Sequence, residues 1–406
     1  MRIGYVARWW PEFGGSYHYD RFAIAALRRA APDAELLVFY ADDQLPRDLA
    51  SLAGGVVFIK LIDGATSMRL FPRLVRRVIR FFYEMLSVQP IVFANLELKK
   101  HRLDVCISTA PFVDGVFADC ANVLMVHDLW YRRYEVKHWA VSRVDWWSLR
   151  TQVGIWNSDL FIVESPLGKH DLQEFGKLDE KRVKVVPLPA APFVAQYVDE
   201  RLPLPEIVSS PYILYPAHFL PFKNHAVILR ALLHLRVKGL RLCAVFCGPV
   251  TAPDYRNQVA QLVEELELED QVVLQGFVSD RDLAALYQHA TAVVMASKFG
   301  PTNMPIWEAM AFGTPIVSCD VGDMPWQVGE AGLIFPVDDD AVLASHLELL
   351  VNDSELAAEY VRRGKKKFSS LRQAEWGMVF LDAVQQAILL HETEPPWKAS
   401  DIGPLV

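Results

Sequence analysis

The chain has 406 residues, of which 52% are hydrophobic, and its formal net charge is −8 at pH 7. The apolar content excludes a disordered protein, and the length predicts two domains of roughly 200 residues, because one hydrophobic core rarely organises a longer chain. The acidic balance leaves no broad basic surface of the kind that neutralises a nucleic-acid backbone, so no nucleic-acid partner is expected.

Cysteine spacing and hydropathy predict a cytoplasmic protein. The five cysteines include no Cys-x-x-Cys pair and fit neither a disulfide framework nor a four-ligand zinc site, which indicates a reducing compartment. Uncharged apolar runs stay shorter than the ~18 residues of a membrane span, and charge appears too early at the N-terminus for a signal peptide. We therefore expect a soluble chain that contacts a membrane at most peripherally, at its inner face.

In the first half of the chain, predicted strands alternate with predicted helices. Residues 2–7 read as a buried strand, a glycine-bearing loop follows, and residues 17–31 have apolar side chains at helical spacing. Further strands are predicted at 34–40, 55–59, 104–108, 122–126, 159–163 and 182–187. Such alternation is typical of a parallel sheet.

Arginines gather on one side of a predicted helix at residues 69–82. On a helical wheel five of them fall within an arc of about 100°, and most apolar side chains lie outside it. These are Arg69, Arg73, Arg76, Arg77 and Arg80. The helix is either interfacial, touching anionic lipid, or an ordinary domain helix whose arginines are solvated.

Two loops of this half carry candidate binding residues. Gly14 and Gly15 permit close approach of the backbone to a ligand, although a Gly-Gly pair usually forms only a turn. His127 and Asp128 follow the strand at 122–126 and so lie at the carboxyl edge of the sheet, where ligands bind. His127 either contacts a ligand or is held by neighbouring backbone, and Asp128 is also a candidate helix cap.

Dense prolines between Pro187 and Pro211 interrupt both helix and strand and predict an interdomain linker. A second alternation follows, with strands near 212–215, 241–246, 271–274, 292–296, 314–318 and 332–335. Beyond residue 338 the pattern is helical, at 338–350, 354–368 and 371–391. The acidic run 338–340 opens the first of these helices, so it is interpreted as a cap and not as a metal site.

The stretch from Ser297 to Gly313 follows a strand, turns through glycine and proline, and enters a helix. Thr302 or Asn303 can act as the N-cap and Pro305 suits the first turn, so free amides and the helix dipole would face a phosphate. Glu308 lies about one turn further in, where a carboxylate can accept both hydroxyls of a ribose. The alternative is a capped core helix whose acidic residue favours the dipole.

This stretch resembles the donor-binding motif of glycosyltransferase family 4, the retaining enzymes of the GT-B fold. Residues 274–278, 282–287, 314–318, 322–325 and 331–336 continue the likeness. The resemblance implies an α/β protein of two Rossmann-like domains whose parallel sheets face a central cleft. It implies an acceptor-side domain at 1–195, a nucleotide-sugar domain at 196–370, and a last helix at about 371–391 that packs back on the first domain.

The family's motif has two glutamates separated by seven residues, and Gly300 occupies the position of the first. By resemblance, Glu308 holds the ribose, while the donor sugar loses one carboxylate partner. We hypothesise that Thr302, Asn303 and backbone amides take over these contacts. The donor-binding residues implied within the motif are Gly300, Thr302, Asn303, Met304, Pro305 and Glu308.

Residues 215–225 resemble the family's loop that carries basic residues onto the diphosphate. Lys223 would stabilise the charge of the leaving diphosphate without a metal, and His218 stands where many relatives have arginine. The resemblance also places the Gly14-Gly15 loop against donor or acceptor, and makes His127 a hydrogen-bonding partner of one of them. Catalytic roles are thus implied for His127, Lys223 and Glu308.

The function implied is a retaining glycosyltransferase that moves a sugar from a nucleotide-diphosphate sugar to a saccharide or lipid-linked acceptor, with no cofactor, in surface polysaccharide biosynthesis. Two alternatives stay open. A sugar-nucleotide epimerase of the same fold would transform the donor without an acceptor. A non-catalytic nucleotide-sugar-binding relative would fit the loss of a carboxylate at Gly300. The sequence identifies neither the base, the sugar nor the acceptor.

Overall fold

The computed structural model describes residues 1–7, 15–40, 54–60, 98–109, 119–127, 129, 158–208, 211–250, 252–300, 302–371 and 375–394. The chain divides into two compact units. The N-terminal unit comprises residues 1–11, 20–187 and 374–406, and the C-terminal unit comprises residues 12–19 and 188–373. Within the described residues, no helix has both the length and the apolar composition that crossing a bilayer requires.

The N-terminal unit is built on a parallel sheet with strand order β3-β2-β1-β4-β5-β6-β7. The strands are β1 (Arg2–Val6), β2 (Glu35–Tyr40), β3 (Val56–Lys60), β4 (Val105–Ser108), β5 (Ala121–Met125), β6 (Leu160–Val163) and β7 (Val183–Val185). The central strands β4, β5 and β6 are buried along their whole length and mostly apolar, as is typical of a parallel sheet covered on both faces. The described helices are α1 (Gly15–Ala30), α8 (Pro166–Gly176), η3 (Glu180–Arg182) and α17 (Trp376–Thr393).

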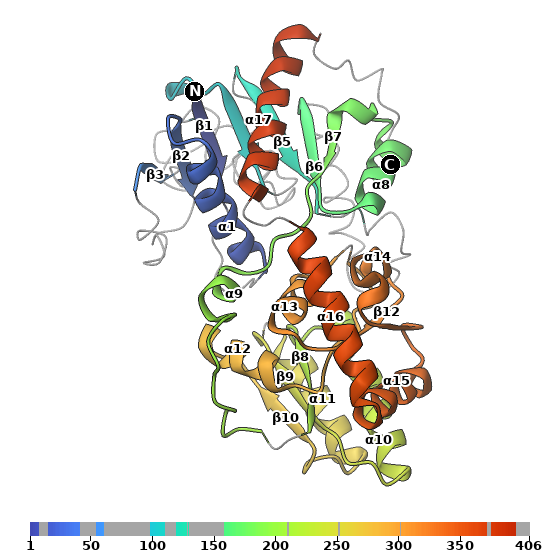
Figure 1. Cartoon of the computed structure of the whole chain (residues 1–406). Coiled ribbons are helices and arrows are strands. Elements are labelled where there is room, and N and C mark those ends of the chain that lie inside the picture. Colours follow the sequence, from blue (N-terminus) through green and yellow to red (C-terminus); the bar gives the residue numbers. More distant parts are fainter. Residues whose placement is uncertain are drawn as a thin grey trace, which may run out of the picture. The chain divides into compact units, whose positions relative to one another are not determined.

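Helix α17, although last in the sequence, lies on this first sheet and contacts β4, β5 and β6 (Figure 1). Trp376 at its start donates a hydrogen bond from Nε1 to the Pro187 carbonyl at 2.9 Å and packs edge-on against Phe22 of α1. Gly377 lies so close to α1 that a Cβ there would be 2.4 Å from the Ala26 carbonyl oxygen. The absence of a side chain at this glycine therefore sets how closely the two helices approach.

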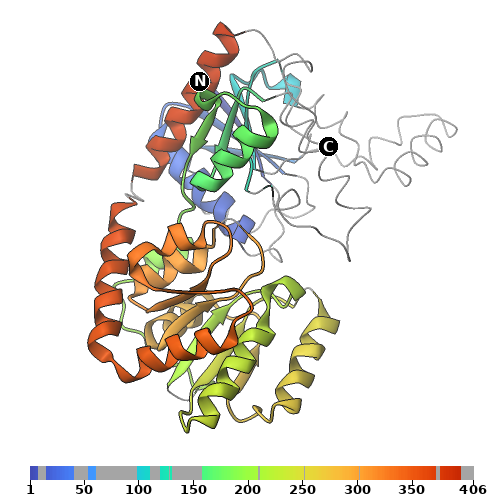
Figure 2. The same ribbon diagram turned by 90° about the vertical axis from the view of Figure 1, so that its right-hand side faces the viewer.

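The C-terminal unit repeats the architecture with a six-stranded parallel sheet of order β10-β9-β8-β11-β12-β13, flanked by helices (Figure 2). Its strands are β8 (Tyr212–Pro216), β9 (Cys243–Cys247), β10 (Val272–Gln275), β11 (Ala292–Met295), β12 (Ile316–Cys319) and β13 (Leu333–Phe335). Its helices are α9 (Pro192–Tyr197), η4 (Pro221–Lys223), α10 (His225–Val237), α11 (Pro253–Glu265), α12 (Asp280–His289), α13 (Met304–Phe312), α14 (Met324–Val328), η5 (Gly329–Ala331), α15 (Asp340–Asn352) and α16 (Ser354–Ser370).

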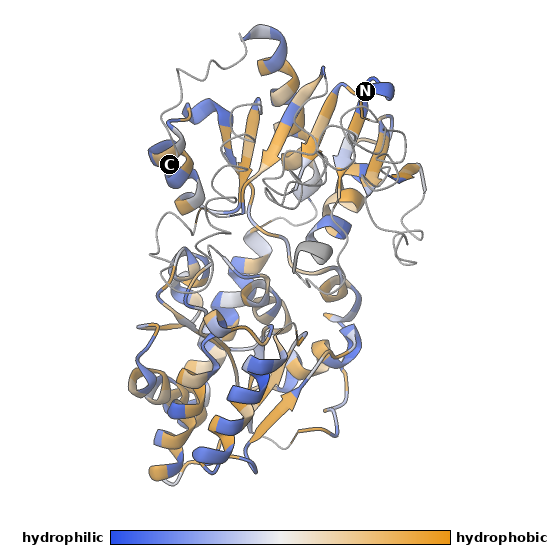
Figure 3. Cartoon of the chain, turned by 180° about the vertical axis from the view of Figure 1, so that it is seen from behind, coloured by the Kyte–Doolittle hydropathy of each residue, from blue (hydrophilic) through white to orange (hydrophobic). Residues whose placement is uncertain are grey.

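The predicted fold class, two α/β units with parallel sheets, is confirmed. Apolar runs identified the strands because burial on both faces removes the polar alternation of an exposed sheet, and most of the strand surface in Figure 3 has the hydrophobic colour. The acidic run before α15 is a cap, as predicted: the Asp339 side chain accepts a hydrogen bond from the Val342 amide at 2.9 Å. The arginine-rich segment at 69–82 lies outside the described residues.

Replacing Gly377 by alanine is expected to destabilise the protein by about 1–3 kcal/mol, because the new methyl group must push α17 away from α1. Helix propensity alone would predict the opposite sign, since alanine is favoured over glycine in a helix. Urea denaturation measures the change. Gly54→Ala is the matched control, because a Cβ there meets nothing within 4 Å; equal stability of the two variants would contradict the packing argument.

Candidate functional site

The strand order of the C-terminal sheet reverses between β8 and β11, which pair as neighbours. Ligands of open α/β sheets bind beyond the carboxyl ends of strands at such a point. The loop after β8 carries Lys223, and its Nζ donates a hydrogen bond to Ser297 Oγ of the loop after β11 at 3.1 Å. Phe222 stacks on Phe299 with ring centroids 4.1 Å apart, so the two loops are packed together.

Lys223 is a half-buried cation at this junction. Burial lowers its pKa to about 8, since the charged form loses solvation. No carboxylate among the described residues forms an ion pair with its ammonium group, although Ser297 is a hydrogen-bond partner. At neutral pH the group is still mostly protonated, so its charge is available to an anion at the end of the sheet.

Two histidines on the same loop are kept neutral. The pKa of His218 falls to about 4, first because of burial and then because of the nearby Lys223 charge. His225 is fully buried, stacks on Phe219 with centroids 5.0 Å apart, and has its pKa lowered to about 3 by the same two causes. His218 therefore does not supply the positive charge of the arginine for which it stands in the resemblance.

Helix α13 follows the loop that contains Ser297 and begins without a side-chain cap. Asn303 occupies the N-cap position with extended backbone, as predicted, but its side chain makes no capping hydrogen bond. Its backbone is clasped by Gln327 of α14: the Asn303 amide donates to Gln327 Oε1 at 2.9 Å, and Gln327 Nε2 donates to the Asn303 carbonyl at 2.7 Å. The Asn303 Nδ2 atom is buried and has no hydrogen-bond partner among the residues that the structure describes. The helix start is thus fixed from the side by Gln327 and not by a side chain of its own.

Glu308 is 5% exposed and lies in the second turn of α13. Its carboxylate accepts a hydrogen bond from the Tyr287 hydroxyl at 2.7 Å and another from the Ala191 amide. Burial nevertheless raises its pKa to about 7, and no described cation pairs with it. A buried carboxylate that is half protonated at neutral pH, next to an open helix start, is a candidate ligand-binding group.

Gly300 has a φ of +126°, a conformation that side-chain-bearing residues rarely adopt. A Cβ there would meet nothing within 4 Å, so backbone conformation, not space, requires glycine. A glutamate in this backbone conformation would be strained.

In the N-terminal unit, His127 joins three adjacent strand ends. Its Nδ1 contacts a carboxylate oxygen of Glu164, which follows β6, and its Nε2 lies 2.9 Å from the carbonyl oxygen of Thr109, which follows β4. A carbonyl oxygen only accepts, so Nε2 carries a hydrogen, and the Nδ1–Glu164 contact then holds one further proton between the two groups. Both ring nitrogens are engaged, so a hydrogen bond to a sugar requires the ring to release one partner.

The structure therefore places most predicted site residues in the C-terminal unit and His127 in the N-terminal unit. The first group is His218, Lys223, Gly300, Thr302, Asn303, Met304, Pro305 and Glu308. His127 lies in the N-terminal unit, and Gly15, the first residue of α1, falls in the stretch 12–19 that belongs to the C-terminal unit. Gly14 and Asp128 lie outside the described residues. Sequence reasoning missed Ser297, Gln327, Tyr287 and Glu164 as site residues. Glu164 alone had a signal, a polar residue directly after a buried strand.

Residues 200–367 match the model of the family described as Glycosyl transferases group 1. The chain is 35% identical over 163 residues to the O-antigen chain mannosyltransferase B of Escherichia coli, covering 39% of this chain and 42% of that protein. It is 29% identical over 233 residues to an MMP alpha-(1->4)-mannosyltransferase of Mycolicibacterium hassiacum, covering 56% of this chain and 53% of that protein. The matched stretches span about half the length of these curated relatives or less.

Solved structures resemble the chain over nearly its whole length. A sucrose-phosphate synthase from Thermosynechococcus elongatus superposes with a TM-score of 0.72 at 20% identity, covering 97% of this chain and 100% of that chain. WaaG, a glycosyltransferase involved in lipopolysaccharide biosynthesis, superposes with a TM-score of 0.69 at 13% identity, covering 95% of this chain and 99% of that chain. At such identities the likeness shows the fold, and the predicted GT-B fold is confirmed.

Glu308→Gln is expected to remove a pH dependence of stability. Because burial raises the pKa of the folded carboxyl, the folded state holds a proton that the unfolded state has lost, so the contribution of Glu308 to stability falls as pH rises from about 4.5 to about 7. The loss is on the order of 2–3 kcal/mol. Urea denaturation of wild type and variant from pH 5 to 8 measures it; a difference that does not change with pH would refute the assignment.

Glu164→Ala is expected to destabilise the N-terminal unit by about 3 kcal/mol, because it removes the buried carboxylate that Nδ1 of His127 contacts. Glu164→Gln should recover most of this loss, since its amide can donate to Nδ1 of the tautomer that keeps Nε2–H on Thr109. Denaturant titrations of the two variants provide the comparison. A glutamine as damaging as alanine would mean that the charge, not the hydrogen bond, holds His127.

Proposed function

We propose that the chain is a retaining glycosyltransferase of family 4 that moves a sugar from a nucleoside-diphosphate sugar to a saccharide or lipid-linked acceptor, in the assembly of a surface polysaccharide. The observation that supports it most strongly is Lys223, a half-buried ammonium without a carboxylate partner, hydrogen-bonded to Ser297 at the head of the loop that leads into α13. The relatives named for mannosyl transfer and lipopolysaccharide biosynthesis support the substrate class.

In this proposal the diphosphate takes the position between Lys223 and the start of α13. The ammonium supplies a charge-assisted hydrogen bond, and the positive end of the dipole of α13, whose start has no side-chain cap, favours the negative charge. Glu308 lies one turn deeper, so its carboxylate accepts the ribose hydroxyls. Binding at a half-buried site excludes water, which strengthens each of these interactions.

The reaction breaks the bond between the anomeric carbon and the β-phosphate oxygen and forms a bond from that carbon to the acceptor oxygen on the same face. The proton of the acceptor hydroxyl passes to the departing phosphate oxygen. Negative charge grows on that phosphate as its bond to carbon breaks, and Lys223 stabilises it there. Retention by front-face attack fits the C-terminal site, because Glu308 is held by Tyr287 and Ala191 within the unit and is not a free nucleophile.

Gly300 favours one second candidate, a nucleotide-sugar-binding protein without transferase activity. The missing glutamate removes a contact to the donor sugar, whereas Lys223 and Glu308 serve the nucleotide. The two candidates differ in one outcome: a binding protein retains the nucleotide sugar without releasing nucleoside diphosphate in the presence of any acceptor.

The test begins with a thermal-shift screen of UDP-, GDP- and ADP-sugars, since a bound donor raises the melting temperature. With the donor that binds, Lys223→Ala should lower kcat by about a hundredfold, because one electrostatic contact to the leaving group is lost. Glu308→Ala should weaken nucleotide binding about tenfold with a smaller effect on kcat.

Lys298→Ala is the matched control, because this lysine follows Ser297 on the neighbouring loop but pairs with Asp338 at 2.7 Å. Its kinetics should stay close to those of the wild type. Wild-type kinetics in both Lys223→Ala and Glu308→Ala would rule out the proposed site.

A further inference from the structure

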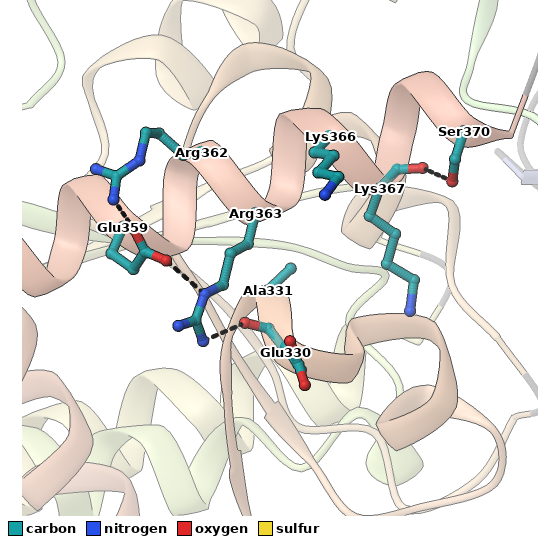
Figure 4. A pocket seen from close by; sticks show the side chains of 8 residues that line it. All are labelled: Glu330, Ala331, Glu359, Arg362, Arg363, Lys366, Lys367 and Ser370. Carbon is teal, nitrogen blue, oxygen red and sulfur yellow. Dashed lines mark hydrogen bonds and ion pairs between the residues drawn. The ribbon is translucent and has the colours of Figure 1, made fainter.

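A groove rich in basic side chains lies on the C-terminal unit between α16 and η5, with a volume of about 720 Å³. We call it the α16 groove. It is lined by Glu330, Ala331, Glu359, Arg362, Arg363, Lys366, Lys367 and Ser370 (Figure 4). The run from Arg362 to Lys367 contains five cations in six residues, in a chain whose net charge is −8. None of these residues belongs to the donor site described above.

The helical lining residues recur at intervals of three and four along α16 and therefore share one face of the helix. The opposite face is buried: Gly364 packs against Met310 of α13. In Figure 4 the Arg363 and Lys367 side chains extend from α16 toward η5 and α14. Packing thus fixes the rotation of the helix and presents the cations to the groove.

The charges in the groove are not balanced by its own carboxylates. Glu359 is shared by Arg362 and Arg363, and Arg363 also donates to the Glu330 carbonyl at 3.3 Å. Lys367 donates to the Trp326 carbonyl at 2.7 Å, and its pKa is lowered by burial. No carboxylate among the described residues pairs with Lys366 or Lys367, so four cations face two acidic side chains.

The helix dipole does not account for this arrangement. Cations are favoured in the last turn of a helix, which explains Lys367, but Arg362 and Arg363 lie about two turns before the end of α16. Pairs such as Arg362 with Lys366 and Arg363 with Lys367 stand four residues apart, where like charges repel and weaken the helix. A bound anion would relieve that repulsion.

We propose that the α16 groove binds the phosphate groups of an anionic ligand, with Arg362, Lys366 and Lys367 as the cations that contact it. The planar guanidinium of Arg362 can hold two phosphate oxygens at once, and the lysines add mobile point charges at the other end of the groove. Phosphate chemistry of this kind is offered either by a free phosphate compound or by a phospholipid headgroup.

The direct test titrates inorganic pyrophosphate into the full-length protein by calorimetry. The parent protein for this titration carries Lys223→Ala, so that the proposed donor site does not contribute to the signal. A wrong assignment of the donor site can then be told apart from a wrong assignment of the groove. Arg362→Glu with Lys366→Glu should weaken binding about tenfold or more. Glu359→Gln should tighten it, because it releases Arg362 and Arg363 from their shared partner.

The matched control is Arg241→Glu with Arg281→Glu, which changes net charge equally on exposed surfaces of the same unit. Binding within about twofold of the parent is expected for this control. If the variant with Arg362→Glu and Lys366→Glu fails to fold, the variant with Arg362→Ala and Lys366→Ala replaces it. Its control is then Arg241→Ala with Arg281→Ala. No pyrophosphate binding by the parent, or equal losses in groove and control variants, would overturn the proposal.

A second arm identifies the source of the phosphate. Vesicles of phosphatidylcholine, with and without phosphatidylglycerol, are sedimented with the protein. Retention on the anionic vesicles that is lost in the groove variant and kept in the control means a lipid headgroup. Pyrophosphate binding without vesicle retention means a free phosphate compound.

Discussion

The hydrogen bond from the Lys223 ammonium to Ser297 ties together two loops that are 74 residues apart in the chain. It exists because β8 and β11 are neighbours in the sheet, so their carboxyl ends emerge side by side. A cation held there is partly stripped of water, and burial lowers its pKa to about 8. An anion at this point would restore the lost solvation, which is why the arrangement favours a ligand that carries a diphosphate.

The position of the Ser297 loop at the carboxyl end of β11 also determines where the other residues of the C-terminal site lie. The loop that contains Ser297 passes through Gly300 at positive φ and enters α13, whose start is held by the Gln327 clasp and not by a side-chain cap. Glu308 follows on that helix as a buried carboxylate with a raised pKa. The carboxyl edge of one sheet and the helix that follows it thus carry a cation, a helix start without a side-chain cap and a titrating carboxylate, each with a role in the proposed donor binding.

The sequence carried enough information for both sheets and for the fold class, because buried parallel strands leave long apolar runs. It carried less about the site. The partners Ser297 of Lys223, Tyr287 of Glu308 and Glu164 of His127 lie 74, 21 and 37 residues away, so only the folded chain shows the pairs. The role of Gln327 could not be predicted either, because a side chain that hydrogen-bonds to a distant backbone has no fixed sequence spacing from its partner. The positive φ of Gly300 is likewise set by the loop, not by its neighbours in the sequence.

The central claim is that Lys223 carries the charge that meets the diphosphate. The most direct test is a calorimetric titration near pH 8.5 with the nucleoside diphosphate whose sugar derivative binds. Repeating it in buffers of different ionisation enthalpy gives the number of protons taken up on binding. Because an anion raises the pKa of Lys223 from about 8, binding should take up a fraction of a proton, and the uptake should vanish in Lys223→Ala. Binding without proton uptake, or with the same uptake in the variant, would contradict the account.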